Sequence, residues 1–164
     1  MKTPTDYRPA GHPSAVPYLI VKGAAQAIEF YCKAFGATET FRMAGPVGGI
    51  AHAEIKIDES PIMLADESPQ MGARSPATIG GTPVFLCIYV RDCDAVVQKA
   101  VAGGAKILRP LENQFYGDRA ATVLDPFGHQ WTIATHIEDV SPEEIMKRAA
   151  AMFGGRRADQ FCLG

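Results

Sequence analysis

The sequence has few of the features that mark specialised classes of protein. Its four cysteines show no CxxC spacing, so neither a zinc ribbon nor a thioredoxin-like motif is indicated. No apolar run approaches the roughly 20 residues needed to cross a bilayer, and the first residues contain no apolar stretch of the signal-peptide type. There is no run of like charge, and the net charge is only −2. We therefore expect a protein of the reducing cytoplasm that binds neither nucleic acid nor membranes.

What the chain does contain is enough apolar sequence for one compact unit, with 47% hydrophobic residues in a length of 164. Residues 1–15, with prolines among polar neighbours, are expected to form an irregular arm. Residues 16–21 predict a strand, and residues 24–35 place apolar side chains on one helical stripe that ends at Gly36. Three strands follow, in ATETFRM, IAHAEIKI and IMLAD. Residues 16–67 are therefore predicted to form a βαβββ module.

The same order of elements starts again about 69 residues later, after a Gly-, Pro- and Ser-rich linker at residues 68–83. Residues 84–137 contain a strand in VFLCIYV, a helix with Asp92 as its N-cap, and strands in AKILRP, RAATVLD and QWTIATH. One such module cannot bury its sheet alone. The predicted fold class is α+β: two tandem βαβββ modules form a cupped mixed sheet, completed within the chain or across a homodimer.

A further helix is predicted within residues 138–164. SPEE at residues 141–144 matches a capping box, and the helix should continue to about Phe153, before two glycines. Two roles remain open for it. It could be a lid or an arm packed on a partner subunit, or it could cover the core of its own chain.

Three features carry a family resemblance: the two consecutive βαβββ modules, the AIEFY helix near the start, and DPFGHQW in the last hairpin. Together they resemble the vicinal oxygen chelate superfamily, which includes glyoxalase I, the bleomycin-resistance proteins and the extradiol dioxygenases. More narrowly, IAHAEIKI followed by IMLAD is similar to the PhnB-like branch. The resemblance covers Val16 to about Thr135, and it implies a glyoxalase-like fold and a homodimer.

Metal-dependent members of that superfamily supply ligands from the head of the first strand and from the last strand of each module. Matched strand to strand, these places are held here by Val16, Met63, Phe85 and Thr132. None is a His, Glu or Asp, and a divalent ion needs several nitrogen or oxygen ligands. We therefore expect no metal and no other cofactor, with a divalent metal as the disfavoured alternative.

The period of two along a strand predicts which side chains line the cup. Ala51, Ala53, Ile55 and Ile57 suit the face under the helices, so His52 and Glu54 should point the other way. Matching RAATVLD to HAEIKID places Arg119 opposite His52. The predicted ligand-binding residues are Tyr18, His52, Glu54, Phe85, Tyr89, Tyr116 and Arg119.

Several of these residues have two interpretations. His52 and Glu54 are the candidate catalytic residues, as a base and its partner or as relocated metal ligands, or they are simply a hydrogen-bonded pair. Arg119 could bind an anionic ligand group or form a salt bridge to Asp118, Glu54 or a partner chain. Tyr116, with Phe115, could form an aromatic gate or pin its loop by burial.

The polar cluster in DPFGHQW is interpreted mainly as structure. Asp125 caps a turn, Pro fixes φ at the next position and Gly128 supplies a positive φ, so DPFG is typical of a hairpin turn. His129 and Trp131 are expected to belong to the scaffold.

These observations predict a metal-independent small-molecule-binding protein of the glyoxalase/bleomycin-resistance type, with a hydrophobic or aromatic ligand. The alternative is a glyoxalase-like enzyme, a lyase, isomerase or dioxygenase, in which His52 and Glu54 supply acid–base or metal chemistry.

Overall fold

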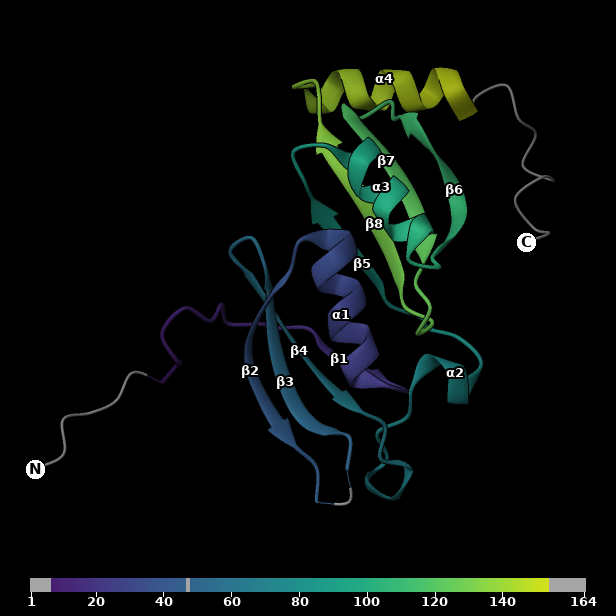
Figure 1. The fold of residues 1–164 in the computed structure, drawn as a ribbon. Helices are drawn as coiled ribbons and strands as arrows, with labels where there is room; N and C mark the ends of the chain where they lie inside the picture. Colours follow the sequence, from purple (N-terminus) through teal and green to yellow (C-terminus); the bar gives the residue numbers. More distant parts are fainter. Residues whose placement is uncertain (1–6, 47, 154–164) are drawn as a thin grey trace, which may run out of the picture.

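Two four-stranded sheets, each with one long helix on one face, make up the body of the molecule (Figure 1). The computed structural model describes residues 7–46 and 48–153. The first module consists of β1 (Tyr18–Val21), α1 (Ala24–Phe35), β2 (Thr38–Ala44), β3 (Ile50–Ile57) and β4 (Ser60–Asp66). Its strand order is β1-β4-β3-β2, with β1 parallel to β4 and the other pairs antiparallel.

The second module repeats this arrangement. It consists of β5 (Phe85–Tyr89), α3 (Cys93–Ala102), β6 (Lys106–Asn113), β7 (Asp118–Leu124) and β8 (Gln130–His136), in the order β5-β8-β7-β6. The connection between the modules contains two short helices, η1 (Pro69–Met71) and α2 (Pro76–Ile79). The predicted α+β fold of two βαβββ modules is therefore confirmed. No helix in the described ranges is long and apolar enough to cross a membrane.

The alternation of apolar and polar residues along the strands decides which face of the sheet each helix covers. From Ala53 on, every second residue of β3 is buried beneath α1, namely Ala53, Ile55 and Ile57, whereas Ala51, predicted on the same face, is exposed. The residues between them are only half-buried, because no helix among the described residues packs on that side of the sheet. Each module thus has one packed face and one open face.

The two modules share a single core. Helix α1 packs against α3, and a Cβ on Gly103 would lie 2.9 Å from the Phe30 ring, so glycine permits this close approach. On the sheet side, His129 Nε2 lies 3.2 Å from the Ile20 carbonyl oxygen, which joins the last hairpin of one module to the first strand of the other.

The DPFG turn is built as a hairpin, as the sequence predicted. Asp125 Oδ1 accepts hydrogen bonds from the backbone N–H groups of Phe127 and His129, both at 2.9 Å. Its second oxygen accepts from the Tyr31 hydroxyl and from Trp131 Nε1, both at 2.8 Å. The carboxylate is 3% exposed, so it holds the turn and also ties α1 to the second sheet.

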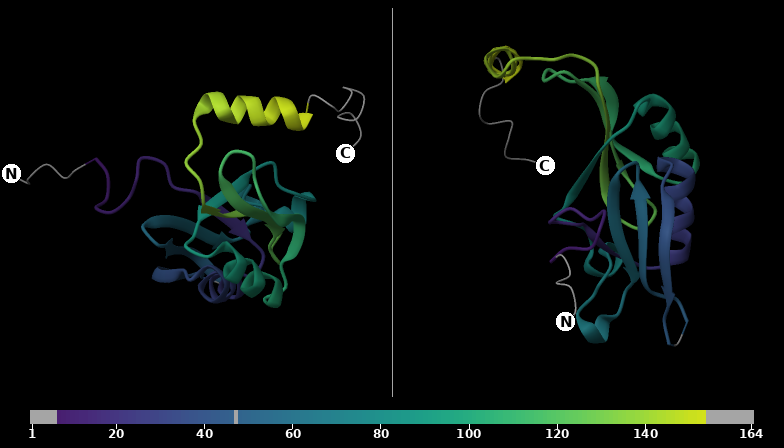
Figure 2. Two further views of the ribbon diagram at one scale, coloured as in Figure 1. Left: turned by 90° about the horizontal axis from the view of Figure 1, so that it is seen from above. Right: turned by 90° about the vertical axis from the view of Figure 1, so that its left-hand side faces the viewer.

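Helix α4 (Pro142–Phe153) stands apart from both sheets (Figure 2). Ser141 Oγ accepts a hydrogen bond from the Glu144 N–H at 3.3 Å, as expected of a capping residue. No described helix or strand packs closely on α4, and its main tether is the pair of hydrogen bonds from Arg148 to Glu138, at 2.8 and 2.9 Å. Helix α4 therefore makes few contacts with the sheets of its own chain, and its role stays a prediction.

Candidate functional site

The open faces of the two sheets carry large apolar side chains. Tyr18, Phe41 and Met43 are about half exposed on the first sheet, and Phe85 and Tyr89 are 59% and 63% exposed on the second. Scattered exposed apolar residues are common, but a row of them across a sheet marks a surface that contacts something else.

A chain of polar contacts crosses the open face of the first sheet. The Tyr18 hydroxyl lies 2.8 Å from His52 Nδ1, and His52 Nε2 lies 3.4 Å from Glu54 Oε1. Partial burial raises the pKa of Tyr18. The structure thus brings three of the predicted residues into one connected group.

His12 extends this group, although no pattern in the sequence selects it. It lies in the irregular arm, where no periodicity assigns a face to a side chain. Its Nε2 lies 3.3 Å from Glu54 Oε2, and both ring nitrogens are buried without a hydrogen-bond partner. Glu54 therefore has an imidazole near each carboxylate oxygen.

Arg119 does not face the cup, so its predicted position is wrong. Its guanidinium makes two hydrogen bonds to Asp94 of α3, both at 2.8 Å, on the packed side of the sheet. Glu54 pairs with Met63 in the first module and Thr122 with Thr132 in the second. Because Met63 and Thr132 hold equivalent places, Glu54 is equivalent to Thr122, and His52 to Ala120. The sequence match was off by one residue, and along a strand such an error moves a side chain to the opposite face of the sheet.

A second polar group on the open face of the other sheet is centred on Asp118, which is 5% exposed. Its carboxylate accepts a hydrogen bond from the Tyr89 hydroxyl at 2.9 Å and lies 2.8 Å from His136 Nδ1. The hydrogen bond to Asp118 raises the pKa of Tyr89 to about 12, and Asp118 also raises the pKa of His136. His136 shares the parity of Thr132 along β8, a signal that could have placed it on this face.

Tyr116 lies farther along the second sheet. It contacts the Phe115 ring edge-on at 5.2 Å, so the two aromatic residues of this loop pack on each other. Tyr116 lines a small hollow of about 80 Å³, together with Arg109, Gln114, Thr122 and Thr132.

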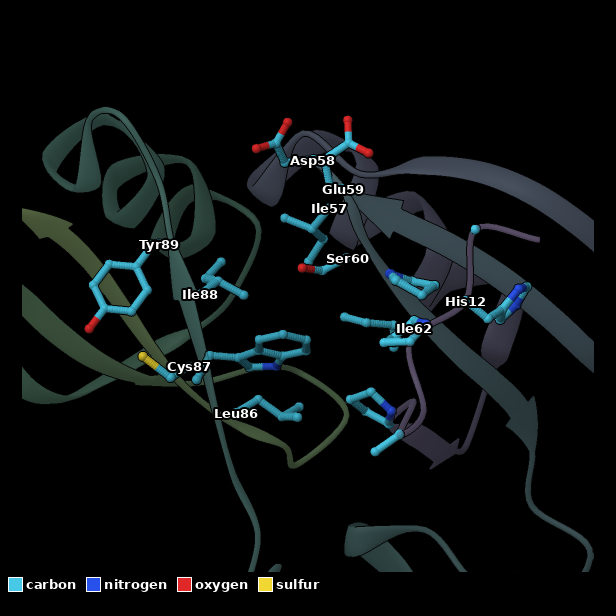
Figure 3. A pocket seen from close by; sticks show the side chains of 16 residues that line it. His12, Ile57, Asp58, Glu59, Ser60, Ile62, Leu86, Cys87, Ile88 and Tyr89 are labelled. Carbon is cyan, nitrogen blue, oxygen red and sulfur yellow. The ribbon is translucent and has the colours of Figure 1, made fainter. Parts of the chain in front are cut away.

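A larger cavity of about 700 Å³ lies between the modules (Figure 3). The arm forms one wall through residues 11–17, the β3–β4 hairpin forms a second through residues 57–62, and residues 86–89 of β5 form a third. Most of these side chains are apolar, and Trp131 also lines the cavity. Tyr89 is the predicted ligand-binding residue that lines this cavity, and His12 lines it from the arm.

Two chemical features of this region limit what it can do. Burial raises the pKa of the Cys87 thiol, so this cavity-lining cysteine is not activated as a nucleophile. The four places at which the family resemblance locates metal ligands hold Val16, Met63, Phe85 and Thr132, and this donor set does not fit a divalent ion. Within the described ranges, no three His, Cys, Asp or Glu side chains are grouped so as to hold a metal.

The family model described as the Glyoxalase/Bleomycin resistance protein/Dioxygenase superfamily matches residues 11–133. The chain belongs to this superfamily. The match begins in the arm at residue 11, so it includes His12, and it ends within β8, so it spans the first module and most of the second.

Several proteins are similar to this chain over most of their own length. The uncharacterized protein Rv0887c of Mycobacterium tuberculosis is 42% identical over 87% of this chain and 86% of its own. The solved structure of the Arabidopsis thaliana At5g48480 product is 27% identical, with a TM-score of 0.60 over 74% of this chain and 98% of that one. The PhnB protein of Bacillus cereus is 19% identical, with a TM-score of 0.57 over 75% and 99%, and shows the shared fold alone.

Proposed function

We propose that this superfamily member binds a small hydrophobic or aromatic molecule in the cavity between its modules. The observation that carries the proposal is the cavity itself. Its volume of about 700 Å³ lies within the range of roughly 300–1,000 Å³ typical of ligand sites, and its walls are mainly apolar with a few polar groups.

Metal independence is the second part of the proposal. It is supported by the thioether, hydroxyl and hydrocarbon side chains at the four places named above, which offer no imidazole or carboxylate. The segments IAHAEIKI and IMLAD, which are similar to the PhnB-like branch, support a position in that branch. The described cysteines, Cys32, Cys87 and Cys93, are all free thiols, which supports a reducing compartment.

We also propose that the protein is a homodimer whose second copy covers the open sheet faces. The exposed side chains of Phe41, Met43 and Phe85 support this, as do the free edges of β1 and β5, because open sheet edges and apolar faces are usually covered. Light scattering coupled to size-exclusion chromatography should give twice the chain mass, and Phe41→Glu should shift it toward the monomer. A monomer at all accessible concentrations would exclude the dimer.

Blocking the cavity tests the binding function. Ala15 lines the cavity from the arm, whereas Ala10 lies in the same arm outside the lining, so Ala15→Phe and Ala10→Phe form a matched pair. In a thermal-shift screen of aromatic metabolites, compounds that stabilise the parent protein should fail to stabilise Ala15→Phe and should still stabilise Ala10→Phe. If both variants respond as the parent does, the ligand binds elsewhere.

A second candidate function is an enzyme, favoured by the connected group of Tyr18, His52, Glu54 and His12 on the first sheet. A carboxylate between two imidazoles could act as a general base assembly. Metal analysis of protein purified without chelator separates the candidates, since stoichiometric Zn, Ni, Fe or Mn would exclude the metal-free proposal. An activity that is lost in His52→Ala and retained in Lys56→Ala, on the same strand, would support the enzyme.

A further inference from the structure

The polar groups around the cavity are unbalanced in charge. The lining includes the carboxylates of Asp58 and Glu59, whereas no Lys or Arg side chain of the described ranges lines it. Figure 3 shows these two carboxylates together at one end of the cavity. The cationic side chain of Lys56 lies close to the arm. Its Nζ is 3.9 Å from the position that a Cβ on Gly11 would occupy, but Lys56 does not line the cavity. The acidic side chains of the lining are therefore not balanced by a Lys or Arg within it.

The hydrogen-bonding groups of the cavity walls that remain free are acceptors. The Tyr89 hydroxyl donates its proton to Asp118, which leaves its oxygen to accept. His12 Nδ1 is buried without a hydrogen-bond partner, whereas Nε2 lies 3.3 Å from Glu54 Oε2, so that a proton on Nε2 would face this carboxylate. In the neutral imidazole, Nδ1 then remains as an acceptor, and a buried polar atom of this kind is normally paired. The site offers acceptors and lacks a cationic donor.

We propose that the cavity selects an apolar ligand that carries a cationic nitrogen, such as an arylalkyl or alkyl amine, over neutral and anionic ligands of similar size. This rests on the proposed small-molecule site and specifies what the site takes. The position of Arg119 agrees with a preference for cationic over anionic ligands. Its guanidinium could have bound an anion, but it is hydrogen-bonded to Asp94 on the other side of the sheet.

Asp58 and Glu59 are exposed to solvent, so dissolved salt partly screens the attraction between their carboxylates and a cationic ligand. We therefore expect a preference of about tenfold at low salt, which shrinks as the ionic strength rises. Contacts with His12 are buried and should respond to salt much less.

Three probes of equal shape test the proposal by isothermal titration calorimetry: biphenyl-4-ylmethylamine, biphenyl-4-ylmethanol and biphenyl-4-carboxylate. The amine should bind about tenfold more tightly than the carboxylate at low salt, with the alcohol between them. The double variant Asp58→Asn, Glu59→Gln should lose most of this difference and keep the affinity for the alcohol. Asn is suited to position 58, whose φ of 51° is left-handed.

Two further variants separate the contributions. Glu112→Gln removes an exposed carboxylate outside the cavity lining and should leave all three affinities unchanged. His12→Leu should weaken the amine and the alcohol several-fold, because both donate a hydrogen bond, and should not weaken the carboxylate.

The outcomes distinguish this inference from the proposed function. If the alcohol binds and the carboxylate binds as tightly as the amine, the cavity is the site but charge selection is wrong. A preference for the amine that survives unchanged in the double variant also overturns the inference. If none of the three probes binds, the proposed small-molecule site itself is wrong.

Discussion

At the scale of single residues, Asp125 shows how a polar group in a functional-looking motif can be structural. Its buried carboxylate accepts four hydrogen bonds, two of them from side chains of different modules. Asp125→Ala would leave these donors unsatisfied in the interior, so we expect it to lower the free energy of unfolding by about 3 kcal/mol or more. Urea denaturation followed by Trp131 fluorescence measures this. Glu112→Ala, on the surface, should change stability by less than about 0.5 kcal/mol.

The same scale shows why one site residue was placed correctly and another was not. His52 lies in a strand whose own alternation of small apolar and polar residues fixes its face. Arg119 was assigned to the open face by aligning β7 with β3. The β7–β8 turn is longer than the β3–β4 turn, so an alignment that starts both turns at the same place is wrong by one residue. His12 could not be selected at all, because its position depends on where the arm lies in three dimensions.

At the scale of elements, the connector between the modules is fixed by one carboxylate. Glu67 Oε2 accepts hydrogen bonds from the Thr78 hydroxyl at 2.6 Å and from the Ser75 hydroxyl at 2.7 Å, and these lower the pKa of Glu67 to about 2. A depressed pKa stabilises the fold above the unfolded value near 4.5 and loses this effect as the pH falls toward 2. Glu67→Gln should therefore be less stable than the parent at pH 7.

The difference between Glu67→Gln and the parent should shrink below pH 4.5 and vanish near pH 2. Urea denaturation at a series of pH values measures it. A constant difference across this range would show that the ionised carboxylate is not what stabilises the connector.

Helix α4 was predictable as an element but not in its position. SPEE specifies the start of the helix, whereas nothing in the sequence indicates that the helix leaves the body of its own chain. Met146 is 71% exposed on α4, so Met146→Glu should leave the stability of the monomer within about 0.5 kcal/mol. If α4 is an arm on a partner subunit, the same change should raise the dimer dissociation constant, as measured by analytical ultracentrifugation. Loss of monomer stability would instead indicate that Met146 covers its own chain.

At the scale of the whole molecule, the repeat made the architecture accessible from sequence. The same order of strands and helix in both halves predicts two βαβββ modules, and both modules are present, each with its own four-stranded sheet. The cavity between them was not predictable, because it is formed by the arm, one hairpin and an edge strand from distant parts of the chain. Residues were assigned to the cup by strand parity, which describes each sheet separately and carries no information about how two sheets are placed.

The shared core has a consequence for how the molecule unfolds. Tyr31 of the first module and Trp131 of the second meet on the same buried carboxylate, and α1 packs on α3, so neither module keeps its core if the other unfolds. We expect one cooperative transition, with circular dichroism and Trp131 fluorescence giving the same urea midpoint. In Tyr31→Phe, which removes only the hydroxyl contact, the midpoint should fall and the two probes should still coincide. Separate transitions in the parent protein would mean that the modules are independent folding units and that the cavity between them can open without global unfolding.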